Sequence, residues 1–214
     1  MTEHIVEIPA PPVRLAGDLW IPPGSEGLVV FAHGSGSSRL STRNRQVAAA
    51  LNERGLATLL FDLLTSDEEA ERANVFDIEL LGERLLAATR WATANPGTDR
   101  LPVGYFGAST GAAAALCAAA ELDGGIRAVV SRGGRPDMAG GCLGRVTAPT
   151  LLIVGGADRP VLALNEQAAG MLRCPHKVEI VPEATHLFEE PGTLERVAEL
   201  AAAWFTGLLP EPPQ

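Results

Sequence analysis

Lysine is nearly absent from this chain of 214 residues, in which 16 of the 17 basic side chains are arginine and Lys177 is the single lysine. A P-loop requires a Gly-Lys-Ser/Thr sequence, so ATP hydrolysis by such a loop is excluded. Positive charge is scarce as well, because 26 acidic residues bring the formal net charge to −9. This charge repels nucleic-acid phosphates and anionic lipids, and the sequence therefore predicts no nucleic-acid partner and no membrane partner.

Cysteines, long apolar runs and a leader sequence are also scarce or absent. Cys117, Cys142 and Cys174 are far apart and show no Cys-x-x-Cys or Cys/His spacing, so we expect three free, buried thiols and no metal site. No apolar run approaches the roughly 18 residues of a membrane span, and residues 1–11 lack the basic and apolar regions of a secretory signal. These absences predict a cytoplasmic protein.

The length and the 46% hydrophobic content favour one compact domain over residues 1–214. Short apolar runs alternate with helical stretches, a pattern typical of an α/β protein with a mostly parallel sheet covered on both faces. We expect two antiparallel edge strands followed by six parallel ones, at residues 3–8, 13–20, 27–32, 57–61, 101–106, 126–131, 150–154 and 176–181. Helices are expected at residues 43–54, 76–94, 110–121, 162–172 and 194–208.

A G-x-S-x-G sequence at residues 107–111 directly follows an expected strand and directly precedes an expected helix. On such a sharp turn a serine is held in a strained backbone conformation, and the flanking glycines let the strand and the helix approach closely. The amino terminus of the helix favours developing negative charge. The context predicts Ser109 as a nucleophile.

A serine hydroxyl needs a base to take its proton and an acid to orient that base. Of the two histidines after Ser109, His186 lies in a loop just past the last strand, where active-site residues of α/β sheets gather, so it is the predicted base. Asp158 follows the preceding strand and is the predicted acid. Asp137, one strand earlier, is the alternative acid.

The oxyanion of a tetrahedral intermediate requires preorganised N–H donors. One predicted donor is the backbone amide of Thr110, the residue after the nucleophile. The second is the amide of Ser35, in a His-Gly-Ser-Gly loop that follows the third strand. We expect His33 to brace this loop through hydrogen bonds and not to act as a base.

The chain resembles the α/β-hydrolases, and within them the small dienelactone-hydrolase-like branch. The similarity covers essentially the whole length, through the segments FAHGSGSS, FDLLT, GYFGASTGAAAAL, SRGGRPD, LLIVGGADRPV and ATHLFEEPG. It implies an α/β-hydrolase fold and a serine hydrolase of the carboxylesterase type, which works through an acyl-enzyme on Ser109 without metal or organic cofactor. Dienelactone hydrolases use a cysteine nucleophile, so lactone specificity does not carry over. Relatives joined to phosphoribosyltransferase-like domains leave a link to nucleotide metabolism open.

The loops indicate an open site, because only 18 residues separate Ser131 from Thr150 and no cap domain is expected. We therefore expect a small-molecule ester with a short acyl group as substrate. Arg39, Arg132 and Arg135 stand at the same sheet edge and are candidates for binding a substrate carboxylate, with surface solvation as the alternative. Phe188 is a candidate pocket residue, with core packing as the alternative.

Other functions remain open at this stage. A lactonase or a thioesterase would use the same machinery, and a non-catalytic interaction module would share the fold. A dinucleotide-binding oxidoreductase is disfavoured, because Arg39 stands where the third glycine of G-x-G-x-x-G belongs. No heptad or edge pattern separates a monomer from a dimer.

Overall fold

The computed structural model describes residues 2–210, which form one eight-stranded sheet of order β1-β2-β4-β3-β5-β6-β7-β8. The β1–β2 and β2–β4 pairs are antiparallel, and all other neighbours are parallel. The eight-stranded, mostly parallel α/β sheet predicted from the sequence is thereby confirmed. The strands are β1 (Thr2–Ala10), β2 (Val13–Ile21), β3 (Leu28–Ala32), β4 (Ala57–Phe61), β5 (Val103–Ala108), β6 (Ala128–Arg132), β7 (Thr150–Gly155) and β8 (His176–Val181).

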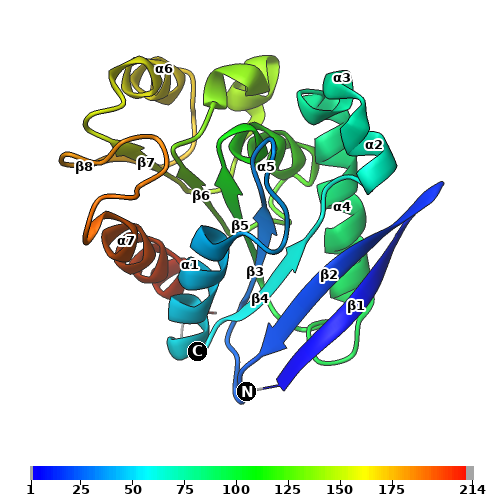
Figure 1. Ribbon diagram of the computed structural model, residues 1–214. Coiled ribbons are helices and arrows are strands. Elements are labelled where there is room, and N and C mark those ends of the chain that lie inside the picture. Colours follow the sequence, from blue (N-terminus) through cyan, green and yellow to red (C-terminus); the bar gives the residue numbers. More distant parts are fainter. Residues whose placement is uncertain (1, 211–214) are drawn as a thin grey trace.

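Helices cover both faces of this sheet (Figure 1). They are α1 (Thr42–Glu53), α2 (Ser66–Ala70), α3 (Arg72–Val75), α4 (Ile78–Ala94), α5 (Thr110–Glu121), the 3-10 segment η1 (Pro136–Arg145), α6 (Arg159–Ala169) and α7 (Thr193–Leu208). Within residues 2–210, no helix is both long enough and apolar enough to cross a membrane.

Two apolar cores, one on each face, hold the layers together. Alternate side chains of the central strands point to opposite faces, so Val30 and Tyr105 pack toward α4 and α5, whereas Phe31 and Phe106 pack toward α1 and α7. The rings of Phe31 and Phe106 lie 4.8 Å apart at their centroids. Because β3 and β5 are buried on both faces, their sequences are continuously apolar, as the sequence pattern indicated.

Several element boundaries differ from the sequence prediction. Strand β5 runs on to Ala108, next to the G-x-S-x-G serine, and α6 starts at Arg159 with proline in its first turn. The acidic stretch after β4 forms α2 and α3, which the sequence analysis left without structure. A capping box between Thr65 and Glu68 begins α2, and this Thr-x-x-Glu signal was present in the sequence.

The expectation of three free thiols is wrong for two of the cysteines. Cys117 on α5 and Cys142 on η1 form a disulfide, whereas Cys174 is free and buried, as predicted. The bridged residues are 25 positions apart, and only the packing of η1 against α5 brings them together. The spacing of the cysteines in the sequence does not predict this contact.

Gly111, in the first turn of α5, allows the helix to meet β3 at backbone distance. A Cβ atom at this position would lie 2.2 Å from the carbonyl oxygen of Ala32 and 2.4 Å from that of His33. Neither oxygen belongs to a flexible side chain, so a side chain at Gly111 would force the helix away from the strand. The loop after β3 and the turn before α5 are held together by this contact.

We expect Gly111→Ala to lower the free energy of unfolding by about 3 kcal/mol, because overpacking against rigid backbone outweighs the better helix propensity of alanine. Urea unfolding followed by circular dichroism measures the change. Gly82→Ala in α4 is the matched control, since its Cβ atom would meet only the Ala114 carbonyl oxygen at 3.9 Å. Equal stability of the two variants would contradict the prediction.

Candidate active site

Ser109 occupies the turn between β5 and α5 with φ of 51° and ψ of −120°. A non-glycine residue with positive φ carries strain of roughly 1–3 kcal/mol, which the surroundings must offset. The amide of Ser109 donates to the Arg132 carbonyl oxygen at 3.3 Å, and its own carbonyl oxygen accepts from the Arg135 amide at 3.0 Å. These bonds fix the turn, and the side chain is half-buried at the carboxyl edge of the sheet.

His186 and Asp158 lie on the loops after β8 and β7, and a hydrogen bond of 2.8 Å joins His186 Nδ1 to Asp158 Oδ2. The Asp158 carboxyl is 14% exposed and the imidazole 38%. With Nδ1–H donating to the carboxylate, Nε2 of the neutral ring is left as a proton acceptor. The pair has the arrangement of a general base with its orienting acid.

The two loops approach each other at a glycine. A Cβ atom on Gly155 would lie 2.3 Å from the Ala184 carbonyl oxygen, and the same oxygen accepts a hydrogen bond from the Ala157 amide at 3.0 Å. Thr185 then binds the Glu190 carboxylate through its amide, at 3.1 Å, and its hydroxyl, at 2.6 Å. The loop that carries His186 is therefore braced on both sides.

Asp137, the alternative acid, and His176, the other histidine after Ser109, contact residues outside the proposed catalytic set. Asp137 forms a two-pronged ion pair with Arg135, with two hydrogen bonds of 2.8 Å. The bonds from Arg135 hold the pKa of Asp137 below its usual value. His176 lies at the start of β8, where its Nδ1 is 2.9 Å from the Cys174 carbonyl oxygen. Among the described residues, Asp158 is the carboxylate hydrogen-bonded to His186.

The loop that carries His186 leaves from β8 but reaches back to the residue that follows β6, the strand next to β5. Gly133, directly after β6, has the His186 carbonyl oxygen 3.1 Å from the position of a Cβ atom, and Arg132 is the β6 partner of Ala108 in the sheet register. Within residues 2–210 the structure shows no direct hydrogen bond between Ser109 Oγ and His186. Bonds of this kind are often long before substrate binds.

The predicted oxyanion residues are neighbours. The Ser35 amide donates to the Thr110 hydroxyl Oγ1 at 3.0 Å, which fixes the loop after β3 against the first turn of α5. The sequence predicted a role only for the backbone amide of Thr110, and the contact of its hydroxyl is visible only in the structure. His33 braces the same loop, as predicted: its Nε2 accepts from the Leu63 amide at 3.0 Å, and its Nδ1 lies 3.0 Å from the Gly34 carbonyl oxygen.

The candidate substrate residues lie in different environments. The Arg39 side chain binds Asp62 at 2.6 Å and lies 3.5 Å from Asp18, so it is already paired with acids. Arg132 is 8% exposed and Phe188 is 2% exposed, and the Arg132 guanidinium lies over the Phe188 ring at 5.9 Å. Core packing, the alternative stated for Phe188, describes its position.

A small hollow of about 10 Å³ lies beside Ser35 and Thr110, the predicted oxyanion residues. Ser35 and Thr110 line one side of it, and Leu63, Leu64 and Leu81 give it an apolar wall. Within the described residues, no cluster of three or more histidine, cysteine or carboxylate side chains could hold a metal ion.

Residues 15–206 match the Dienelactone hydrolase family. The chain belongs to this family. Two Mycobacterium tuberculosis proteins, from strains H37Rv and CDC 1551, are each 61% identical to it over 205 residues, and their assigned name proposes a phosphoribosyl transferase. The match covers 96% of this chain but 46% of those proteins, so the chain spans about half the length of these curated relatives.

Solved structures agree with the family. The crystal structure of a dienelactone hydrolase from Anabaena variabilis is 56% identical, with a TM-score of 0.95 over 97% of this chain and 98% of that one. A serine hydrolase without a lid from Xanthomonas campestris shares the fold at 19% identity, with a TM-score of 0.76 over 99% of this chain and 97% of that one. This member of the dienelactone hydrolase family thus has the α/β-hydrolase fold.

His33 gives this dienelactone hydrolase family member a measurable pH dependence. Burial lowers the pKa of His33 below its usual value of 6.5, although the bond to Gly34 and the charges of Asp62 and Glu69 act in the opposite direction. Below about pH 6.5, His33 binds a proton more readily in the unfolded chain than in the folded chain, so protonation favours unfolding. Stability is therefore complete above about pH 6.5 and falls as the pH drops, by at most about 1.4 kcal/mol per pH unit from this group.

His33→Gln keeps an acceptor for the Leu63 amide and cannot titrate. We expect the variant to be less stable than the wild type at pH 8. The difference between their free energies of unfolding should become smaller as the pH falls to 5. Denaturant unfolding of both proteins across this range measures it. A difference that stays constant with pH would contradict the assignment of a neutral His33.

Proposed function

We propose that this protein is a serine hydrolase that cleaves small carboxylic esters, with Ser109 as nucleophile, His186 as base and Asp158 as orienting acid. The observation that carries the proposal is the 2.8 Å bond between His186 Nδ1 and Asp158 Oδ2, at the same sheet edge as a serine held at a φ of 51°. A strained serine and an oriented imidazole at one sheet edge are the groups that nucleophilic acyl transfer needs.

The reaction passes through an acyl-enzyme. Ser109 Oγ attacks the ester carbonyl carbon while His186 Nε2 takes the hydroxyl proton, and the same proton then goes to the departing alcohol oxygen as the C–O bond breaks. In the second half, His186 Nε2 takes a proton from water, whose oxygen attacks the acyl carbon, and this proton passes to Ser109 Oγ as the bond between Ser109 Oγ and the acyl carbon breaks and the acid leaves. Asp158 stabilises the imidazolium formed in both halves.

The amides of Thr110 and Ser35 are the proposed donors to the oxyanion. The Thr110 amide lies at the amino terminus of α5, where backbone N–H groups have no partner within the helix. The Ser35 amide is held by the Thr110 hydroxyl, which keeps it beside α5 before substrate arrives. When the oxyanion forms, a charged acceptor replaces a neutral one, and hydrogen bonds to charged groups are the stronger kind.

The surroundings of Ser35 and Thr110 support a small substrate. The hollow beside Ser35 and Thr110 is small and has a leucine wall. Between β6 and β7 the chain forms only η1 before it returns to the sheet. Lactones and thioesters would undergo the same acyl transfer, and a lactone has the support of the family name. The transferase name belongs to relatives more than twice as long, so we draw no step from it.

A fluorophosphonate probe tests the nucleophile without knowledge of the substrate. We expect one adduct, on Ser109, and its loss in Ser109→Ala and His186→Ala. Either variant should lower the kcat for short-chain p-nitrophenyl esters by about 10⁴-fold or more, because the members of such a set act as a unit. Intact mass with peptide mapping, together with unchanged circular dichroism, provides the measurement. A variant that keeps a tenth of the wild-type rate would rule out the proposal.

The acid can be tested against its alternative. Asp158→Asn should lower kcat about a thousandfold or more, because the imidazole then loses both its orientation and the charge that stabilises its protonated form. Asp137→Asn, which breaks the pair with Arg135, should lower kcat less than about tenfold. Steady-state ester hydrolysis by the two variants separates the assignments, and the opposite ranking would make Asp137 the acid.

A further inference from the structure

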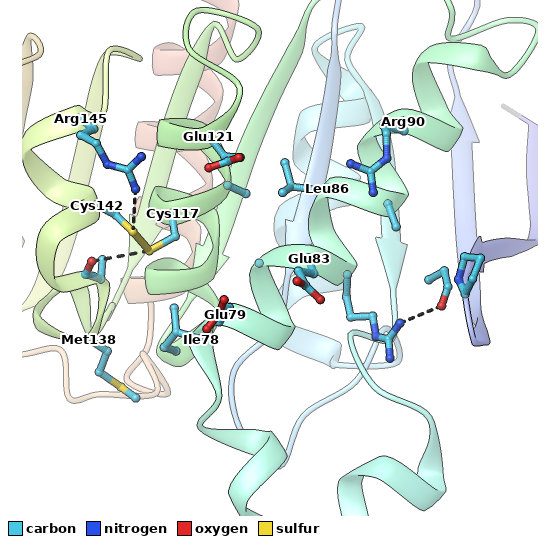
Figure 2. A pocket seen from close by; sticks show the side chains of 17 residues that line it. Ile78, Glu79, Glu83, Leu86, Arg90, Cys117, Glu121, Met138, Cys142 and Arg145 are labelled. Carbon is cyan, nitrogen blue, oxygen red and sulfur yellow. Dashed lines mark hydrogen bonds between the residues drawn. A yellow bond between two sulfur atoms is a disulfide. The ribbon is translucent and has the colours of Figure 1, made fainter.

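A cavity of about 730 Å³ lies away from the ester site, between α4, α5 and η1. None of Ser109, Asp158 and His186 lines it. Figure 2 shows the Cys117–Cys142 disulfide on its wall, where α5 and η1 meet, and the side chains of Glu83, Leu86 and Arg90 on the α4 side. A sulfur–sulfur bond on the wall of a cavity is within reach of a small molecule that enters it.

The surroundings of the two sulfur atoms differ. Arg145, an exposed residue on η1, extends toward the disulfide and places its Nη2 atom 3.9 Å from Cys142 Sγ (Figure 2). Within residues 2–210 the structure records no carboxylate partner for this guanidinium. A cation next to a sulfur atom favours the thiolate, so this charge would stabilise Cys142 when it leaves as a thiolate.

We propose that the Cys117–Cys142 disulfide is a thiol-exchange site, at which a low-molecular-weight thiol of the size of a tripeptide enters the cavity and forms a mixed disulfide with Cys117. The thiolate of the small molecule attacks Cys117 Sγ, the Cys117–Cys142 bond breaks, and Cys142 leaves as a thiolate beside Arg145. The protein bond is reduced by two electrons once a second small thiol attacks the mixed disulfide. That step releases Cys117 as a thiolate and the small molecule as its own disulfide.

The direction of attack follows from the leaving group. Thiol–disulfide exchange is faster when the departing sulfur is the better stabilised thiolate, and the Arg145 guanidinium lies 3.9 Å from Cys142 Sγ. The free cysteine offers a contrast, because Cys174 is buried and burial raises the pKa of its thiol. Exchange should therefore be confined to the disulfide on the cavity wall.

The cavity suits a small thiol that carries charges of both signs. Its volume falls within the range of roughly 300–1,000 Å³ that holds small ligands. Arg90 and Arg145 can bind a carboxylate, and Glu79, Glu83 and Glu121 can bind an ammonium group. The lining also includes apolar residues, among them Ile78, Leu86 and Ala118.

The segment on the far side of the bond can adjust when the bond opens. η1 is a 3-10 segment with a kink at Gly140, where φ is 48°, and helices of this type have weaker hydrogen bonds than α-helices. α5, in contrast, is buried along most of its length. Opening the disulfide releases η1 from a helix that stays in place. The inference does not depend on the ester reaction.

Glutathione is the probe. Native protein is incubated with reduced glutathione, quenched in acid, alkylated and mapped by mass spectrometry over time. We expect a glutathione adduct on Cys117, an alkylated Cys142, and an unmodified Cys174 until the chain is denatured. An adduct confined to Cys142, or a bond that resists glutathione until denaturation, would overturn the proposal in favour of a purely structural disulfide.

Variants of Arg145 test whether its charge stabilises the departing Cys142 thiolate. Arg145→Gln should slow adduct formation about threefold, the effect of a change of about one unit in the pKa of a reacting thiol, and Arg145→Lys should restore the rate. Arg100→Gln is the matched control, since Arg100 is exposed and is not among the residues that line the cavity. Equal rates for Arg145→Gln and wild type would overturn the assignment. A second result would also overturn it: the protein is purified with Cys117 and Cys142 as free thiols, and oxidised glutathione does not convert them to the disulfide.

Discussion

The close approach of β3 and α5 at the turn that carries Ser109 is the constraint on which the remaining geometry depends. Gly111 meets the Ala32 carbonyl oxygen, and a Cβ atom on Gly107 would lie 2.5 Å from the Ala112 Cα atom. A Cβ atom on Gly34 would in turn lie 2.9 Å from the Ser109 Cβ atom. Within this tightly packed backbone Ser109 adopts a positive φ, and its side chain lies half-buried at the carboxyl edge of the sheet.

The order of the sheet brings the other groups to this turn. From β5 to β8 each strand is parallel to its neighbour, so the loops that follow them leave from one edge. Hydrogen bonds then fix these loops relative to one another. The Ser109 amide donates to the Arg132 carbonyl oxygen, and the Ala157 amide donates to the Ala184 carbonyl oxygen. The His186–Asp158 bond closes this series of contacts between loops.

The sequence predicted what depends on local chemistry and missed what depends on packing. The G-x-S-x-G sequence, the continuous apolar strands and the bracing role of His33 follow from residue types at fixed spacing, and the structure contains each of them. The disulfide between Cys117 and Cys142 depends on η1 folding back over α5, for which no local signal exists. Thr65 and Glu68 form a capping box, which is a local sequence signal for the start of α2, but the acidic residues around them resemble a solvated loop.

Arg132 explains how the site holds two strained residues together. Phe188 shares a positive φ with Ser109, at 55°, and is nearly fully buried two residues after the predicted base. The Arg132 carbonyl oxygen receives the Ser109 amide, while its guanidinium lies over the Phe188 ring. Burial, and to a smaller extent the charge of Arg43, lowers the pKa of Arg132 to about 10, so the side chain stays charged at neutral pH. A cation held against an aromatic face in a poorly solvated position attracts the ring more strongly than one in water. One residue at the end of β6 thus stabilises both strained turns, which ties the position of the histidine loop to that of the nucleophile.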